Sequence, residues 1–176
     1  MKLTDLKKQL NTMDKADLIV LICRLYKGNK QCQNLLDLTF DGEAAEAALI
    51  ANCKKKIRAA FFGNRLSLKA ARSVISTFRK GAPSTEGLAE LMLYYVECGV
   101  ELTNVCGDIN EAFYDSIESM FMDYVTLLNM MEHDGCYKKH AARLAKVCYN
   151  AEGIGWGFSE GIASIYYDIQ WRQEDD

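Results

Sequence analysis

Proline is almost absent from this chain: Pro83 is the single proline among 176 residues. Glycines mostly fall between segments in which apolar residues recur every three or four positions. This spacing is typical of helices with one buried face, whereas strands need frequent turn residues and β-branched runs with a period of two. The sequence therefore predicts an all-α fold.

Apolar spacing and capping residues divide the chain into about nine short helices. Three helices should begin at the capping residues Asp14, Ser67 and Ser84. Side-chain oxygens of such residues can accept hydrogen bonds from the free amides of a first turn. The expected helices cover residues 3–13, 14–28, a short segment ending at 40, 43–62, 67–81, 84 to beyond 102, 108–132, 137–151 and 159 onward. We expect a single domain over residues 1–176, built as an irregular bundle of helical hairpins or a short α-superhelix.

Composition and cysteine usage indicate where such a protein works. Apolar residues make up 49% and charged residues 26%, which are ordinary globular values. The longest uninterrupted apolar run, LIVLIC at residues 18–23, is far shorter than the roughly 20 residues of a membrane span, and the start lacks the apolar core of a secretory signal. Seven scattered cysteines without a C-x-x-C pair favour reduced thiols. We expect a cytoplasmic protein that does not enter a membrane.

Charge is divided unevenly along the chain. Residues 1–88 carry 16 Lys and Arg against 8 Asp and Glu, a net +8, whereas residues 89–176 carry 5 against 16, a net −11. A basic half and an acidic half favour a protein-interaction or scaffold module that binds itself or another protein through charged helical faces. The candidate basic face is Lys69, Arg72 and Arg79, and the candidate acidic face is Glu111, Asp115 and Glu118.

The basic stripe of residues 54–80 also suggests a nucleic-acid-binding protein, since a row of cations on a helix can follow phosphates by electrostatics alone. This alternative is not favoured. The chain has a pI of about 5.5, it contains no known nucleic-acid motif, and no aromatic residues alternate with these cations to stack on bases.

Histidine and cysteine occur together in the segment HDGCYKKH. Cys136 and His140 are four residues apart and share one helix face, and His133 precedes them in a predicted turn. They form a reserve candidate for a metal site or a Cys–His pair in an enzyme. Their spacing matches no established zinc motif, and we expect buried thiols and surface histidines instead. The sequence predicts no catalytic residue and no cofactor, and it leans against an enzyme.

The stretch GIGWGFSEGIASIYYDIQW, residues 153–171, could be read as a phosphate-binding turn. Such a turn normally includes a cation, whereas this one is flanked by Glu152 and Glu160. We therefore expect an architectural role, in which the glycines let the backbone bend and Trp156 and Phe158 act as structural anchors in the core.

Two parts of the chain resemble a bacterial family of uncharacterised small helical proteins. The segment LKKQLNTMDKADLIVLICRLYKGNKQCQNLL, residues 6–36, resembles that family's opening leucine helix and acid-capped second helix. The segment GIGWGFSEGIASIYYD resembles its closing turn and last helix, with matches at Gly155, Trp156, Gly157, Phe158, Ile165 and Tyr166. The continuation NLLDLTF departs from the aromatic-rich continuation of the family. The resemblance implies an all-helical cytoplasmic protein and no particular activity.

Overall fold

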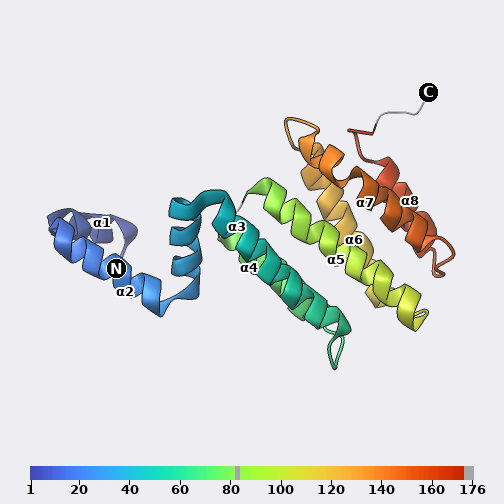
Figure 1. Cartoon of the computed structure of the whole chain (residues 1–176), viewed down its shortest axis with the longest axis horizontal. Helices are drawn as coiled ribbons and strands as arrows, with labels where there is room; N and C mark the ends of the chain where they lie inside the picture. The colour runs from blue at the N-terminus through green and yellow to red at the C-terminus, as the bar shows by residue number, and fades with distance from the viewer. Residues whose placement is uncertain (82–83, 173–176) are drawn as a thin grey trace. The chain divides into compact units, whose positions relative to one another are not determined.

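A computed structural model describes residues 1–81 and 84–172 of the chain (Figure 1). Within these ranges it contains eight helices and no strand, so the predicted all-α fold is confirmed. The chain divides into two compact units, Met1–Ala47 and Ala48–Asp176, and each is described by itself. The single domain expected from the sequence stays a prediction.

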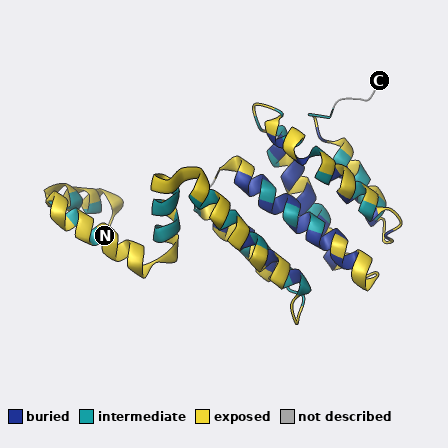
Figure 2. Ribbon diagram, viewed as in Figure 1, coloured by how far each residue is buried: buried dark blue, intermediate teal, exposed yellow. Residues whose placement is uncertain are grey.

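The N-terminal unit contains α1 (Leu3–Thr12), α2 (Lys15–Gly28) and the first part of α3 (Lys30–Phe62). Asp14 caps α2 as predicted, because its Oδ1 accepts a hydrogen bond from the Asp17 amide at 2.7 Å. No residue of α1 or α2 is buried, and several of their apolar residues, among them Leu3, Ile22 and Leu25, are exposed (Figure 2). This unit therefore has helices without a closed core.

Helix α3 contains a kink where two separate helices were expected. Gly42 has φ 55° and ψ −125°, which lie outside the helical region, while helix continues on both sides. Glycine adopts positive φ at little cost because it has no Cβ atom. The predicted break at Asp41-Gly42 is thus real as a kink, but no loop separates the two segments.

The second unit contains the end of α3 together with α4 (Leu68–Lys80), α5 (Thr85–Cys106), α6 (Glu111–Asn129), α7 (Gly135–Ala151) and α8 (Phe158–Tyr167). Helix α5 packs against α4, α6 and α7, and α8 packs against α6 and α7. Buried residues are concentrated on α5 and α6 (Figure 2). Gly99 lets these two helices approach closely, because a Cβ atom there would collide with the Ile117 side chain.

The helix ends confirm some capping predictions and correct others. Ser67 and Ser84 cap α4 and α5, since their hydroxyls accept hydrogen bonds from amides three residues later. Helix α6 begins at Glu111 behind an Asn110 cap, not at Asp108. The last helix begins at Phe158 behind Gly157, so Ser159 lies inside the first turn and does not cap it.

Candidate functional site

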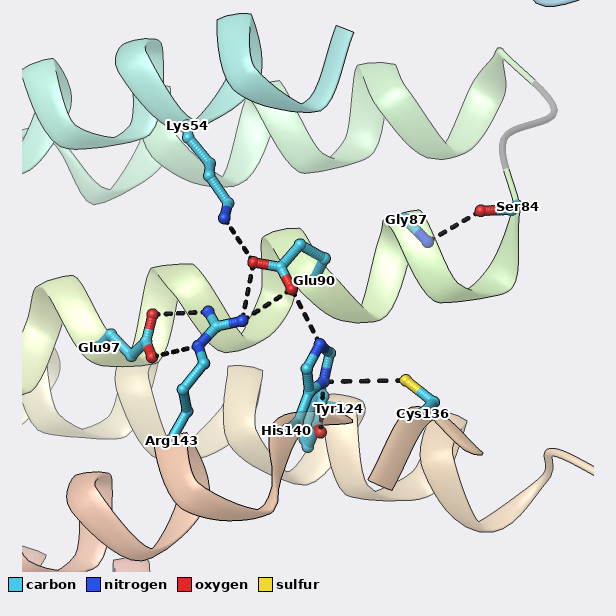
Figure 3. A network of polar contacts seen from close by, with 9 residues as sticks. All are labelled: Lys54, Ser84, Gly87, Glu90, Glu97, Tyr124, Cys136, His140 and Arg143. Carbon is cyan, nitrogen blue, oxygen red and sulfur yellow. Dashed lines mark hydrogen bonds and ion pairs between the residues drawn. The ribbon is translucent and has the colours of Figure 1, made fainter. Parts of the chain in front are cut away.

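A buried carboxylate at Glu90 forms the centre of a charged network in the second unit (Figure 3). Glu90 points from α5 toward α7, where its Oε2 lies 2.8 Å from His140 Nε2. Arg143 Nη1 donates to both carboxylate oxygens at 2.8 and 2.7 Å, and Lys54 Nζ reaches Oε1 from α3 at 2.5 Å. The Glu90 side chain is only 13% exposed, so these partners replace most of its water.

A second carboxylate, Glu97, completes the binding of Arg143. It accepts from Arg143 Nε at 2.7 Å and from Nη2 at 2.8 Å, which is the bidentate geometry that guanidinium and carboxylate groups favour. Glu90 and Glu97 are seven residues apart, or about two helical turns, and therefore share one face of α5. Arg143 thus bridges two carboxylates along that face.

His140 extends the network into the core. It is 1% exposed, and its Nδ1 lies 3.1 Å from the Tyr124 hydroxyl on α6 and 3.8 Å from Cys136 Sγ. Its Nε2 already faces Glu90. Both ring nitrogens therefore have partners, and the network links α3, α5, α6 and α7 (Figure 3).

The network shifts the pKa values of its members in a consistent way. Burial opposes ionisation of Glu90, but hydrogen bonds from His140, Arg143 and Lys54 outweigh burial and hold the pKa of Glu90 well below its ordinary value. Burial raises the pKa of Cys136 to about 11, and nearby Glu86 acts in the same direction. The carboxylate is thus stabilised as an anion, and the thiol is stabilised in its neutral form.

This arrangement is suited to holding helices together and poorly suited to nucleophilic chemistry. Two carboxylates balance two cations, and every buried side-chain nitrogen or oxygen in the described part of the chain has a hydrogen-bond partner. A catalytic cysteine needs a lowered pKa to supply thiolate, and Cys136 has the opposite shift.

One side of the network reaches the surface at a cavity of about 260 Å³ between α5 and α7. Arg143 and Glu97 belong to its wall, and exposed Lys146 lies at its edge. The cavity is lined by Tyr94, Glu97, Cys98, Val100, Glu101, Arg143, Lys146, Val147 and Asn150. Two of the four charged residues in this wall, Arg143 and Glu97, pair with one another, and Glu101 pairs with Arg58 of α3.

The structure brings together two of the three residues in the His–Cys segment. Cys136 and His140 are neighbours on α7, as their spacing predicted. His133 is exposed in the turn before α7, where its Nδ1 accepts a hydrogen bond from the Gly135 amide. The expectation of a surface position is wrong for His140, which is buried. Across residues 1–81 and 84–172, no group of three or more His, Cys, Asp or Glu residues could hold a metal ion.

The candidate basic face is only partly available to a partner. Lys69 and Arg79 are exposed on α4. Arg72 is half-buried and binds Ser116 of α6, with Nε 3.0 Å from its hydroxyl and Nη2 2.7 Å from its carbonyl oxygen. Arg72 therefore joins α4 to α6.

The candidate acidic face is more exposed. Glu111 and Asp115 are exposed on α6, whereas Glu118 is half-buried. Burial and the neighbouring Asp115 raise the pKa of Glu118. Helix α8 approaches this carboxylate at Gly161, where an added Cβ would lie 2.6 Å from Glu118 Oε1.

The two expected anchors of the glycine-rich turn behave differently. Phe158 is completely buried, with its ring 4.8 Å from that of Tyr114. Trp156 is 65% exposed, so the expectation that it fills the core is wrong. Successive residues of this turn point in different directions, and the glycine spacing alone did not indicate which ring faces inward.

Sequence reasoning did not identify the roles of Glu90, Glu97, Glu101, Tyr124 and Arg143. Glu97 binds Arg143, and Glu101 forms a bidentate pair with Arg58 of α3 at 2.9 and 2.8 Å. One feature of the sequence did indicate that Glu90 needs partners. Helix α5 is apolar around most of its circumference, as expected of a helix surrounded by others, so a carboxylate within it needs partners from neighbouring helices.

Comparison with other proteins complements this geometry. None of the described helices is long and apolar enough to cross a membrane. No curated protein and no solved structure matches the chain. A family model described as a family of unknown function, DUF6155, matches residues 1–169. The expected membership of an uncharacterised family is confirmed: the chain belongs to the family of unknown function DUF6155.

Proposed function

We propose that this chain is a protein-interaction module of the bacterial cytoplasm, and that its N-terminal unit, Met1–Ala47, pairs with a second copy of itself. One observation carries this proposal: no residue of the unit is buried, while large apolar side chains are exposed throughout it. They are Met1, Leu3, Ile19, Val20, Ile22, Leu25, Tyr26, Leu35 and Phe40.

Such a unit gains little stability from its own packing. Isolated helices shorter than about 12–15 residues are marginal in water, and α1 and α2 have 10 and 14 residues. On α2, Leu18 and Leu21 are half-buried, whereas Ile19 and Ile22 beside them stay exposed. Burying these exposed residues against a partner supplies the missing core, since apolar burial contributes about 25 cal/mol per Å².

The charge of the unit favours a second copy as the partner. Residues 1–30 carry seven Lys and Arg against three Asp and Glu, whereas residues 31–47 carry four Asp and Glu and no cation. The unit is therefore neutral overall, with a +4 part followed by a −4 part. In a two-fold dimer, the basic part of each copy can face the acidic part of the other, so each favourable contact occurs twice.

Sedimentation velocity of the full chain at increasing concentration tests this pairing. We expect a dimer that persists in 1 M salt, because apolar burial does not depend on screened charges. The double substitution Ile19→Glu with Ile22→Glu should shift the chain to the monomer, since four carboxylates would enter the shared apolar surface of a dimer.

A control is Met122→Glu, which places one such charge on an exposed apolar residue of α6 outside the unit. This variant should sediment like the parent chain. A parent chain that stays monomeric at about 100 µM, far above a typical micromolar dissociation constant, would refute the pairing. A dimer that persists in the Ile19→Glu, Ile22→Glu variant would show that the interface lies outside this apolar surface.

Association through the charged halves is a second form of the same function. It joins the basic half, residues 1–88, to the acidic half, residues 89–176, and it weakens as salt shortens the screening length. Part of this charge is already matched within one chain, since Lys54 pairs with Glu90 and Arg58 with Glu101. A dimer that dissociates between 0.05 and about 0.5 M salt would favour this form over the apolar one.

Nucleic-acid binding is the less favoured alternative, because Lys54, Arg58 and Arg72 already bind other residues of the second unit, Ala48–Asp176. It depends on Lys69 and Arg79, the exposed part of the stripe. Heparin retention that is lost on changing both residues to glutamate would support it.

An enzyme or metal protein built on Cys136 and His140 is the weakest alternative. The raised pKa of the thiol and the occupied imidazole nitrogens oppose a nucleophilic role. Stoichiometric metal in the purified protein would reverse this ranking.

A further inference from the structure

The backbone at Trp156 is unusual. Among the described residues, Trp156 is the only non-glycine residue with a positive φ, at 61°. Glycine reaches this left-handed region freely, whereas an L-residue with a side chain pays a steric cost there. The indole ring that causes this cost is mostly exposed and contributes little to the core. The fold alone therefore gives no reason for tryptophan at this position.

The turn around Trp156 is firmly held from both sides. Phe158 is buried against Tyr114, and the Tyr114 hydroxyl donates to Asp108 Oδ1 at 3.2 Å. Gly155 packs close to the same carboxylate, since an added Cβ would lie 3.3 Å from Asp108 Oδ2. The exposed ring is thus carried on a positioned backbone, which lowers the entropy lost when a ligand binds.

The surroundings of the ring are acidic. Asp108 lies beside Gly155, and the charged residues closest in sequence, Glu152 and Glu160, are also acidic. The nearest cation after the turn, Arg172, lies over the rings of Tyr166 and Tyr167 at 4.7 and 4.3 Å. The cation–π contacts found within the described ranges all involve other rings, so the face of Trp156 is open.

We propose that Trp156 is a binding site for a guanidinium or ammonium group carried by a basic peptide segment of a partner protein. Tryptophan is the best aromatic platform for such cations, and the flanking carboxylates add attraction of the same sign. Further apolar surface lies at this end of the unit. Val105 and Tyr149 are exposed there, and the adjacent Asn104 and Asn150 join the ends of α5 and α7 by a hydrogen bond. Exposed apolar surface for the rest of a peptide therefore lies at the same end of the unit as the turn that carries Trp156.

Fluorescence anisotropy of a labelled peptide tests this site on the full chain. The probe is Gly-Arg-Gly-Arg-Gly with blocked ends, and its control replaces arginine by neutral citrulline. We expect binding of the arginine peptide alone. Trp156→Ala should weaken binding by about 2- to 30-fold, which corresponds to a cation–π contact of about 0.5–2 kcal/mol. Trp156→Tyr should retain part of the affinity, because tyrosine is a weaker platform.

Two controls separate binding from folding. Met122→Ala removes an exposed apolar side chain from α6 and should bind the peptide like the parent chain. Trp156→Gly should weaken binding about as much as Trp156→Ala does, because it removes the same ring, yet its Tm should be unchanged or about 2–4 °C higher, because glycine relieves the positive φ. The dimer mass should be unaffected by all three Trp156 substitutions, so this site and the N-terminal pairing can fail independently.

Three results would overturn the proposal. Equal binding of the arginine peptide by the parent chain and by Trp156→Ala would show that the ring is not part of the site. Equal binding of the arginine and citrulline peptides would show that the site does not recognise a cation. Free arginine amide that competes as well as the peptide would make the ligand a small molecule instead of a protein segment.

Discussion

Burial alone would raise the pKa of Glu90, but its hydrogen-bond partners lower that pKa and favour the ionised carboxylate. Three donors on two other helices compensate for the lost water. Removing one member of a buried ion pair usually costs more than the pair contributes, because the remaining charges lose their partner. The Glu90 carboxylate therefore supplies the negative charge that stabilises Lys54 and Arg143 in their half-buried positions.

We expect Glu90→Gln to lower the free energy of unfolding by about 3–5 kcal/mol, since Lys54 loses its counter-charge and Arg143 keeps only Glu97. Urea denaturation followed by circular dichroism measures this change. Glu101→Gln is the matched control, because the Glu101 side chain is 45% exposed in its pair with Arg58. Surface pairs of this kind contribute at most about 1 kcal/mol. Equal effects of the two substitutions would contradict the central role of Glu90.

The depressed pKa of Glu90 also sets a pH dependence. Its stabilising contribution is fully present above the pKa of an unfolded glutamate, near 4.3, and is lost only as the pH falls through the lower folded value. The stability difference between the parent chain and Glu90→Gln should therefore persist at pH 5. Denaturation curves at pH 7 and pH 5 should separate the two proteins by a similar amount.

At the scale of elements, α5 and α6 depend on one glycine for their close contact. We expect Gly99→Ala to lower the free energy of unfolding by about 1–3 kcal/mol, since the new methyl group would collide with the completely buried Ile117 side chain. Gly28→Ala is the control, because nothing lies within 4 Å of an added Cβ at the end of α2. That variant should unfold at the same urea concentration as the parent or slightly above it, and a similar loss in both variants would contradict the steric explanation.

Helix α6 illustrates what local sequence determines. Its apolar residues recur at helical spacing, and helical geometry alone brings to one face the buried residues Phe113, Ile117, Met120, Tyr124 and Leu128. Most of the fold was predictable in this way from spacing and caps.

The candidate site was not predictable by the same means. Its contacts join residues 50 and 53 positions apart, Glu90 with His140 and with Arg143. No periodicity within one helix records which residues of two helices meet. The exposure of Trp156 was missed as well, because the residue type indicates neither its positive φ nor the direction of its ring.

At the scale of the whole molecule, the seven free cysteines should differ widely in reactivity. Cys23 and Cys106 are exposed, whereas burial raises the pKa of Cys98 to about 12 and that of Cys136 to about 11. Alkylation by iodoacetamide at pH 8, followed by peptide mass spectrometry, should modify the exposed pair first and the buried pair last, because thiolate is the reactive form. In denaturant the rates should converge, and fast native modification of Cys136 would contradict its burial.

The contrast between α5 and the N-terminal helices has a consequence for hydrogen exchange. Amides of a helix surrounded by packed neighbours open only when the unit unfolds, so those of α5 should report the global unfolding free energy. Helices α1 and α2 contain no buried residue, so their amides should exchange by local opening. If the N-terminal unit pairs with a second copy, protection of α1 and α2 should rise with protein concentration while that of α5 stays constant. Exchange rates in one experiment would then report folding through the α5 amides and association through the amides of α1 and α2.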